Sequence, residues 1–307
     1  VINGQAALDY SGRVASAGDV NGDGFSDLIV GAFGSDPAAG LNAGRSYVVF
    51  GRSNSTAVDL SAVASGLGGF VINGQSTGDL SGFPVASAGD INGDGLSDLL
   101  VGAFSSDPAA GFNAGRSYIV FGKNNTTPVN LSAIATGIGG FVINGQSAYD
   151  GSGFSLANAG DVNGDGLTDL IIGAIFGDPA AGLNAGRSYV VFGKSSSAAI
   201  NLSAVAAGTG GFAINGQNVL DYSGSVSSGG DVNGDGLADL IIGANSSDPA
   251  AGNSAGRTYV VFGKSTTSSI DLSAVATGNG GFVINGQCAF DYSGGSGVSS
   301  AGDVNGD

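Results

Sequence analysis

Five segments of the chain place Asp, Asn and Gly at one fixed spacing. Four read Gly-Asp-(Val/Ile)-Asn-Gly-Asp-Gly-x-x-Asp in full, and the fifth runs only as far as Asp307. Their first aspartates recur at intervals of 71, 71, 70 and 72 residues. Side-chain oxygens at the first, third, fifth and ninth positions can converge on one cation with a backbone carbonyl from the seventh, and glycine at the sixth permits a sharp turn. The spacing therefore predicts a calcium loop in every repeat of a tandem array.

The expected ligands are the same in each copy. Oxygen donors without nitrogen or sulfur favour a hard cation, and a loop of this flexibility suits Ca2+ better than octahedral magnesium. The twelfth position, which is Glu in an EF-hand, is Val30 here, so we expect each loop to join two strands. The predicted ligands are Asp19, Asn21, Asp23, Phe25, Asp27, Asp90, Asn92, Asp94, Leu96, Asp98, Asp161, Asn163, Asp165, Leu167, Asp169, Asp231, Asn233, Asp235, Leu237, Asp239, Asp303, Asn305 and Asp307, where Phe and Leu contribute backbone carbonyls.

The alternative interpretation of these loops is an ordinary hairpin turn, because Asp, Asn and Gly are common turn residues. The four complete copies keep Asp, Asn, Asp, Gly and Asp at the same five offsets, whereas the nearby segments 53–57, 124–128, 195–199 and 265–269 vary freely. Duplication explains the similarity of the copies but not this contrast. The constancy of the loops beside variable neighbouring segments favours a calcium loop over an ordinary turn.

The composition limits the classes of partner that the protein is expected to bind. The 307 residues include 9 Lys and Arg and 25 acidic residues, all of them Asp, and the formal net charge is −16. We expect no nucleic acid partner, because no run of basic residues is present to contact phosphates. The single cysteine, Cys288, excludes an internal disulfide, and we expect a small, half-buried side chain there. No stretch of about 18 apolar residues occurs, so we expect no membrane span in this chain.

The residue types argue against an enzyme. The chain contains no His and no Glu, so Ser-His-Asp and Cys-His arrangements cannot be built from it. An Asp-Pro pair recurs in four repeats with an Arg nine residues after the Asp, as in Asp107 and Arg116. We interpret this pattern as a turn-forming Asp and a strand-edge Arg rather than a ligand-binding ring. The tyrosine two residues after each Arg, such as Tyr118, is interpreted as packing between repeats rather than a sugar-stacking platform.

The second repeat shows which elements must position these residues. Residues 69–75 form a short apolar strand closed by Asn-Gly, and residues 83–88 form a small-residue strand that runs into the loop. Residues 99–103 are continuously apolar, so this strand must be covered on both faces. Residues 116–122 form a fourth strand that alternates between two faces. Residues 130–137, with an Asx or Ser N-cap and a terminal Gly, predict one or two helical turns.

Four short strands and a crossover in each repeat predict an all-β fold. We expect a β-propeller of four-stranded antiparallel blades with about 70 residues per repeat. The alternative is a linear β-solenoid or stacked-sheet array, but solenoid rungs are usually far shorter. The chain is interpreted as a single repeat array over residues 1–307, with units 1–69, 70–140, 141–211, 212–281 and a partial unit 282–307. Because it opens and closes inside a repeat, we expect a fragment of a larger propeller or array.

The ordered motifs resemble the FG-GAP repeats of integrin α-subunit β-propellers and of many bacterial surface proteins. The resemblance rests on Ser-Gly-Phe at 81–83 and 152–154, on the aspartate loops, and on apolar runs such as 28–32 and 47–51. It implies that the strand after Ser-Gly-Phe is innermost in its blade and that the calcium loop joins it to the second strand, away from the axis. It also implies seven blades in a closed propeller. Phe is replaced by Arg13, Ser225 and Gly295, which alters the expected packing of those blades.

Three functional classes follow from these observations. The leading one is a calcium-binding extracellular β-propeller that acts as an adhesion module for a protein or glycan ligand on the cell surface or matrix. The second is a structural subunit of an extracellular fibre, sheath or surface layer, built by self-association. The third is an accessory propeller of a secreted hydrolase. Extracellular modules typically bind calcium with a Kd of about 10⁻⁴ to 10⁻³ M, so we expect the sites to fill outside the cell or at its surface.

Overall fold

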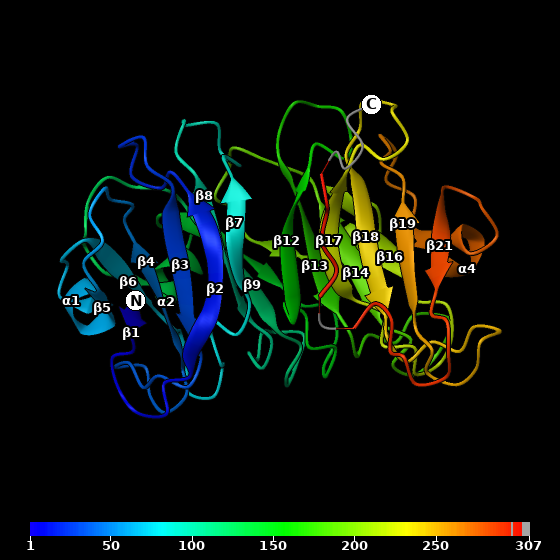
Figure 1. The fold of residues 1–307 in the computed structure, drawn as a ribbon, viewed down its shortest axis with the longest axis horizontal. Coiled ribbons are helices and arrows are strands. Elements are labelled where there is room, and N and C mark those ends of the chain that lie inside the picture. Colours follow the sequence, from blue (N-terminus) through cyan, green and yellow to red (C-terminus); the bar gives the residue numbers. More distant parts are fainter. Residues whose placement is uncertain (296, 303–307) are drawn as a thin grey trace. The chain divides into compact units, whose positions relative to one another are not determined.

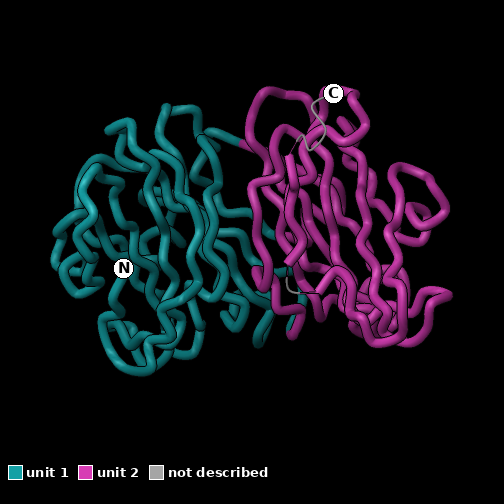
Figure 2. The backbone as a smooth tube through the Cα atoms, viewed as in Figure 1, with its two compact units in different colours: residues 1–148, 194–201 teal, residues 149–193, 202–307 magenta. Residues whose placement is uncertain are grey.

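The computed structural model describes residues 1–295 and 297–302. They divide into two compact units, one of residues 1–148 with 194–201 and the other of residues 149–193 with 202–307 (Figure 2). Each unit contains two sheets of four main strands, drawn in Figure 1. Three predicted ligands, Asp303, Asn305 and Asp307, lie outside the described residues.

The first unit holds the first and second sheets. In each, the main strands pair antiparallel with their neighbours in chain order. The first strands of the two sheets, β2 and β7, lie side by side. The first sheet consists of β2 (Ser11–Gly18), β3 (Asp27–Ala32), β4 (Arg45–Val49) and β6 (Gly69–Asn73), and the second of β7 (Val85–Gly89), β8 (Asp98–Ala103), β9 (Arg116–Val120) and β11 (Gly140–Asn144).

The second unit holds the third and fourth sheets, which repeat the same order and pairing. The first strands of these sheets, β12 and β17, are again in contact. The third sheet consists of β12 (Ser155–Gly160), β13 (Asp169–Ala174), β14 (Arg187–Val191) and β16 (Gly211–Asn215), and the fourth of β17 (Ser225–Gly230), β18 (Asp239–Ala244), β19 (Arg257–Val261) and β21 (Gly281–Asn285). The prediction of an all-β fold with four-stranded antiparallel blades is confirmed.

A crossover follows the third strand of every sheet. It contains a two-residue strand, which pairs in parallel with an outermost strand or with β1 (Ile2–Asn3), and then a short helix. The predicted helical turns are therefore confirmed. The two-residue strands are β5 (Val58–Asp59), β10 (Val129–Asn130), β15 (Ile200–Asn201) and β20 (Ile270–Asp271), and the helices are α1 (Leu60–Ala64), α2 (Leu131–Ile134), α3 (Leu202–Ala206) and α4 (Leu272–Val275).

The expected side-chain N-cap of these helices is wrong for α1, α2 and α4. Asp59, Asn130 and Asp271 occupy the N-cap positions without a side-chain cap bond. Their Oδ1 atoms instead accept hydrogen bonds from asparagine Nδ2 atoms of neighbouring strands, as in the 3.1 Å bond from Asn73 to Asn130. The crossover thus uses its Asx residue to join adjacent strands rather than to cap its own helix.

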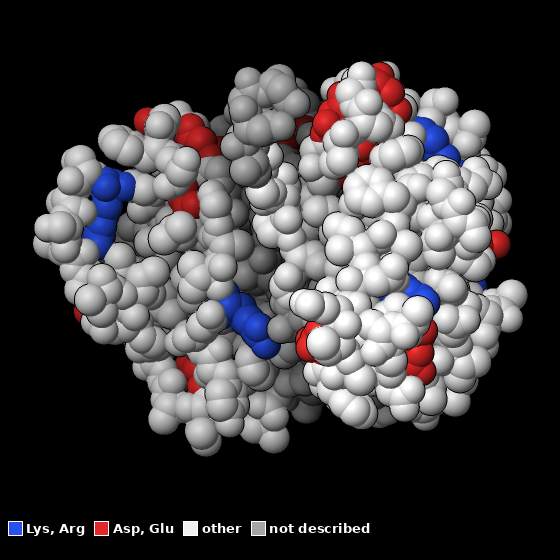
Figure 3. All heavy atoms as spheres, turned by 45° about the vertical axis from the view of Figure 1, so that its right-hand side comes forward, with Lys and Arg blue, Asp and Glu red and all other residues white. Residues whose placement is uncertain are grey.

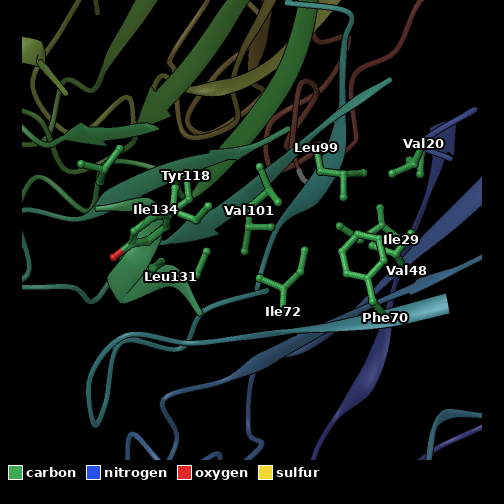
Figure 4. Close-up of a cluster of buried hydrophobic side chains, with 14 residues drawn as sticks. Val20, Ile29, Val48, Phe70, Ile72, Leu99, Val101, Tyr118, Leu131 and Ile134 are labelled. Atoms are coloured by element: carbon green, nitrogen blue, oxygen red, sulfur yellow. The ribbon is translucent and has the colours of Figure 1, made fainter. Parts of the chain in front are cut away.

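The core lies between neighbouring sheets. In the first unit, Ile29, Phe70 and Ile72 from the first sheet pack with Leu99 and Val101 from the second (Figure 4). All six residues of β8 are buried, as the continuous apolar run predicts. An equivalent cluster joins the third and fourth sheets in the second unit. Within each unit the two sheets therefore share their apolar surfaces, which explains why a blade cannot bury its core alone.

The strand pairing places the blade boundaries differently from the predicted units. The units divide the sequence at residues 69/70, 140/141, 211/212 and 281/282, which falls within or beside β6, β11, β16 and β21. Backbone pairing makes each of these the fourth main strand of the preceding sheet, for example β6 against β4. The sequence period defines the repeat length, but the hydrogen bonds define where a blade begins.

Candidate metal loops

Each complete aspartate loop joins the first strand of a sheet to the second, in agreement with the expectation for a strand–strand loop. The segments 19–27, 90–98, 161–169 and 231–239 connect β2 to β3, β7 to β8, β12 to β13 and β17 to β18. Glycine at the sixth position has a left-handed φ of 85° at Gly24 and 88° at Gly95. This conformation requires glycine and produces the predicted turn.

Hydrogen bonds within each complete loop fix the first three predicted side-chain ligands. In the second loop, Asp90 Oδ1 accepts hydrogen bonds from the backbone N–H groups of Gly93 (2.7 Å) and Asp94 (3.0 Å), and Asp90 Oδ2 accepts one from Gly95 (2.8 Å). Asn92 Nδ2 donates to Asp94 Oδ2 at 3.0 Å. The same bonds recur in the other three complete loops. The loop is therefore wound around its first aspartate.

The closing aspartate anchors the loop to the sheet. Asp98 is fully buried, its Oδ2 accepts a 3.0 Å bond from the Ile91 N–H, and its Oδ1 accepts a 2.8 Å bond from the Gly122 N–H. Gly122 follows the third strand, so Asp98 ties three strands together at one end of the sheet. The equivalent aspartates Asp27, Asp169 and Asp239 are also buried and make the same two bonds.

The closing carboxylates lie in an unfavourable environment for negative charge. The pKa of Asp98 is raised to about 7, mainly by burial and to a smaller extent by the carboxylates of Asp94 and Asp90, against the lowering effect of the two backbone N–H donors. Burial likewise raises the pKa of Asp169 to about 6 and raises those of Asp27 and Asp239. Each loop thus holds three carboxylates within electrostatic range of one another. A bound cation would relieve this repulsion.

The donor chemistry of the loops fits a hard divalent cation, since carboxylate, amide and carbonyl oxygens are its preferred ligands. In the described part of the chain, however, no group of three or more His, Cys, Asp or Glu side chains is arranged to hold a metal ion. The carboxylate oxygens instead accept backbone N–H groups within the loop. The assignment of individual ligands, including the carbonyls of Phe25, Leu96, Leu167 and Leu237, stays a prediction.

The Asp-Pro and tyrosine positions have the structural roles expected of them. Asp107 Oδ1 accepts a 2.7 Å bond from the Asn113 N–H and so closes the turn before the third strand. Arg116 Nε donates to Asn144 Oδ1 at 3.2 Å, which joins the third and fourth strands. Tyr118 is fully buried in the cluster between sheets. These residues hold adjacent strands and sheets together.

Two other expectations need revision. Cys288 is exposed rather than half-buried, because it lies in the turn after the edge strand β21. Replacement of the Ser-Gly-Phe aromatic by Arg13 does not remove aromatic packing: the Arg13 Cζ atom lies 4.4 Å from the centroid of the Phe83 ring in the next sheet. An arginine can thus take the place of an aromatic ring by stacking on its neighbour.

The sequence reasoning missed four buried aspartates. Asp9, Asp79, Asp150 and Asp221 are at most 7% exposed, and each stands before x-Ser-Gly at the start of a sheet. Asp79 Oδ2 accepts a 3.1 Å bond from the Ser76 N–H, and Asp221 Oδ2 accepts one of 3.1 Å from Ser247 Oγ. Burial raises the pKa of Asp79 to about 6. The recurrence of Asp-x-Ser-Gly was the signal that could have revealed them.

The surface offers no continuous basic area on the face drawn in Figure 3, where the few Lys and Arg side chains are separated by uncharged residues. Among the described residues, no helix has the length and apolar character needed to cross a bilayer. The ordered loops and buried aspartates are therefore the most distinctive chemical features of the molecule.

The fold and the repeated loops define the class of protein. The FG-GAP repeat family model matches residues 11–49, 84–120, 152–191 and 223–261, and each match covers the first three strands and the aspartate loop of one sheet. The chain belongs to the FG-GAP repeat family, and its four-stranded sheets are blades of the β-propeller type.

The similar proteins include integrin alpha subunits and phosphatidylinositol-glycan-specific phospholipases D. Integrin alpha-PS2 of Drosophila melanogaster is 29% identical over 258 residues, which is 80% of this chain and 16% of the integrin. Phosphatidylinositol-glycan-specific phospholipase D is 32% identical over 188 residues in Bos taurus and over 180 residues in Dictyostelium discoideum. These alignments cover 60% and 56% of this chain and 21% and 19% of the phospholipases. The chain thus spans about a fifth of the length of the curated relatives that it matches.

Proposed function

We propose that the chain is a calcium-stabilised propeller module that binds a protein or glycan ligand in adhesion. The observation that carries this proposal is the loop at 90–98, where the carboxylates of Asp90 and Asp94 act electrostatically on the buried Asp98, together with three counterparts that repeat its hydrogen bonds. Burial raises the pKa of Asp98, so a cation beside this carboxylate would stabilise its ionised form. The recurrence of the same internal bonds in four loops supports a cation site in each loop.

In this proposal each residue of the loop has a definite role. Asp90, Asn92, Asp94 and Asp98 hold the ion through side-chain oxygens, and Leu96 contributes its backbone carbonyl. When bound, calcium supplies positive charge that offsets the carboxylate repulsion. Because Asp98 also accepts the N–H of Gly122 after the third strand, an ion there would strengthen the junction of three strands. At free calcium about tenfold above Kd, each filled site contributes roughly 1.4 kcal/mol to stability.

A binding role is supported by the named relatives, since one group consists of integrin α subunits. The second group carries phospholipase names, but the chain covers about a fifth of those enzymes. We propose a non-catalytic role for this chain, supported by its lack of His and Glu. We also propose that it acts outside the cell or at the cell surface, where calcium is abundant enough to fill sites with a Kd of about 10⁻⁴ to 10⁻³ M.

Calorimetric titration of the purified chain with calcium tests the metal proposal. We expect saturable binding near four ions per chain, one for each complete loop. Asp94→Ala should lower the stoichiometry by one, because Asp94 is an exposed ligand without a role in tying the strands together. The matched control is Asp107→Ala, which removes one exposed carboxylate outside the loops and should leave the stoichiometry unchanged.

Thermal unfolding with and without a chelator completes the test. Calcium should raise the melting temperature of the wild-type chain, and the rise should be smaller in the Asp94→Ala variant. The metal proposal is contradicted if no saturable heat of binding is measured, or if the melting temperature is the same with and without chelator. The loops would then be interpreted as ordinary turns. The adhesion part is tested separately, by retention of the calcium-loaded chain on immobilised matrix proteins and glycans. No retention on either would contradict it.

A further inference from the structure

A cavity of about 340 Å³ lies in the first unit, where the first sheet meets the crossover of the second sheet. Its volume is at the lower end of the range for small-ligand sites. Its walls come from the Asp-Pro loop before β4, from β6 and the turn after it, and from β10 and α2 of the crossover. Among the described residues that line it, none is charged. The side chains of the lining include those of Ala38, Ala39, Asn73, Gln75, Asn130 and Ser132.

A chain of hydrogen bonds orients the two asparagine amides of this cavity. Arg45 Nε donates to Asn73 Oδ1 at 3.2 Å, and Asn73 Nδ2 donates to Asn130 Oδ1 at 3.1 Å. Because a guanidinium group can only donate, Asn73 must turn its oxygen to Arg45 and its nitrogen to Asn130. Asn130 therefore accepts through its oxygen, and its NH₂ group remains available for a ligand.

Gln75 is held in a similar way. The Tyr118 hydroxyl donates to Gln75 Oε1 at 2.7 Å, so the bonded end of this amide is its oxygen. Within the part of the chain that the structure describes, the Nε2 group of Gln75, the Nδ2 group of Asn130 and the hydroxyl of Ser132 have no hydrogen-bond partner. The cavity thus offers two NH₂ groups and one hydroxyl, and the two amides are oriented before any ligand arrives.

These groups fit a ligand that is rich in neutral oxygen atoms. An NH₂ group only donates, so the ligand must supply acceptors, and the hydroxyl of Ser132 can donate or accept. The described lining has no basic side chain to neutralise an anion, and the formal net charge of −16 disfavours one further. The methyl groups of Ala38 and Ala39 add apolar contact. Neutral hydroxyl and ring oxygens next to C–H groups are the chemistry of an uncharged sugar.

The second unit repeats these sequence positions with one change, because Asp271 stands where the first unit has Asn130. Asn215 Nδ2 donates to Asp271 Oδ1 at 2.8 Å, so the aspartate keeps the bond that joins the two strands. A carboxylate has no N–H group, however, and it carries a negative charge. The fold therefore accepts either residue at this position, and only Asn adds a free NH₂ group.

We propose that this cavity binds one residue of a neutral glycan. Asn130 Nδ2 and Gln75 Nε2 donate to hydroxyl or ring oxygens of the sugar, and Ser132 Oγ forms a further hydrogen bond with it. Asn130 and Ser132 are exposed to solvent, so a sugar can reach them without rearrangement of the fold. The inference rests on the proposed adhesion function, for which it names the class of ligand and the site.

Titration of the purified 307-residue chain with neutral methyl glycosides, followed by nuclear magnetic resonance, tests this proposal. The sugars are the methyl glycosides of glucose, mannose, galactose and N-acetylglucosamine. We expect at least one of them to shift the side-chain NH₂ signals of Asn130 and Gln75 in a saturable manner. The methyl glycoside of glucuronate, whose carboxylate finds no basic partner in the described lining, should bind more weakly than that of glucose.

Asn130→Asp tests the free NH₂ group without disturbing the fold. We expect binding to weaken at least about tenfold, because one donor is lost and a negative charge is added. The melting temperature should be unchanged, since Asp271 makes the same strand-to-strand bond in the second unit. The matched control is Asn279→Asp, the same change at an exposed residue in the turn after α4, which should bind like the wild type.

The outcomes separate this inference from the proposed function. The inference is overturned if none of the four neutral glycosides shifts the NH₂ signals of Asn130 and Gln75, or if Asn130→Asp binds sugar as well as Asn279→Asp does. The adhesion proposal survives either result if the calcium-loaded chain is still retained on immobilised matrix proteins. Saturable sugar binding at the cavity, by a chain that is retained on neither proteins nor glycans, would contradict the adhesion role and leave the site in place.

Discussion

The hydroxyl of Tyr118 donates a 2.7 Å hydrogen bond to Oε1 of Gln75, which joins the third strand of the second sheet to the turn after the first sheet. The tyrosine ring is fully buried in the cluster between the two sheets, and burial raises its pKa to about 12. One residue therefore supplies both apolar packing and a specific polar link between neighbouring blades. The same pair recurs as Tyr259 and Gln217 in the second unit.

Tyr118→Phe should test the polar part of this link alone. The ring and its packing are kept, while the hydroxyl that Gln75 accepts from is lost. We expect the free energy of unfolding to fall by about 1 kcal/mol, the usual net contribution of one hydrogen bond. Urea unfolding followed by circular dichroism measures the change. Tyr292→Phe, at a ring that is 49% exposed, serves as the control and should leave the midpoint unchanged.

The core between the first and second sheets should depend on Leu99. This side chain is fully buried and packs among residues of both sheets. Leu99→Ala removes three carbons and leaves a cavity, so we expect a loss of about 3 kcal/mol in unfolding free energy. Leu67→Ala makes the same change at a side chain that is 69% exposed. Equal unfolding midpoints for these two variants would contradict the described packing.

Asp79 should make the protein more stable in mild acid. Burial raises its pKa to about 6 from the ordinary value of 3.8, so the folded state binds a proton more readily than the unfolded state does. The favourable contribution is fully present below pH 3.8 and is lost as the pH rises through about 6. Asp79→Asn should therefore raise the melting temperature at pH 7 and change it little at pH 4. Melting curves at the two pH values, in chelator, measure this.

The control for that experiment is Asp107→Asn, at an exposed aspartate that accepts a backbone N–H and keeps this acceptor as Asn. Its effect on the melting temperature should be similar at both pH values. A variant Asp79→Asn that is destabilised equally at pH 4 and pH 7 would show that the carboxylate is needed for its bonds to Ser76 and its neighbours. The burial of its charge would then not be the dominant effect.

Position 95 should require glycine because of its backbone conformation and not because of steric crowding. Its φ is 88°, and a methyl group added there would meet no atom within 4 Å. Gly95→Ala therefore isolates the strain of a left-handed residue, which is about 1 to 2 kcal/mol. We expect a lower melting temperature and weaker calcium binding by this loop. Gly12→Ala, where the added methyl also has open space and φ is not left-handed, should be neutral or slightly stabilising.

The repeat length, the strand types and the position of the aspartate loops could be predicted from the sequence. Residues such as 99–103 and the Asn-Gly turn carry local signals, because burial on both faces and left-handed turns restrict which residues fit. The phase of the blades could not be predicted, since residues 69–73 are an equally good first or fourth strand until β6 is seen to pair with β4. The buried Asp79 was also missed, because the type of a residue does not reveal what covers it.

The sequence by itself determined that this protein is an array of β-blades with oxygen-rich loops, because spacing and residue type act within a few residues. The tertiary structure decided to which sheet each fourth strand belongs and which asparagine bonds to which crossover. It also decided where burial raises the pKa of a carboxyl group. Those properties depend on contacts between residues about 30 to 60 positions apart, such as Arg116 with Asn144 and Asn73 with Asn130. A local pattern cannot specify such pairs, since any strand edge of the right composition would satisfy it.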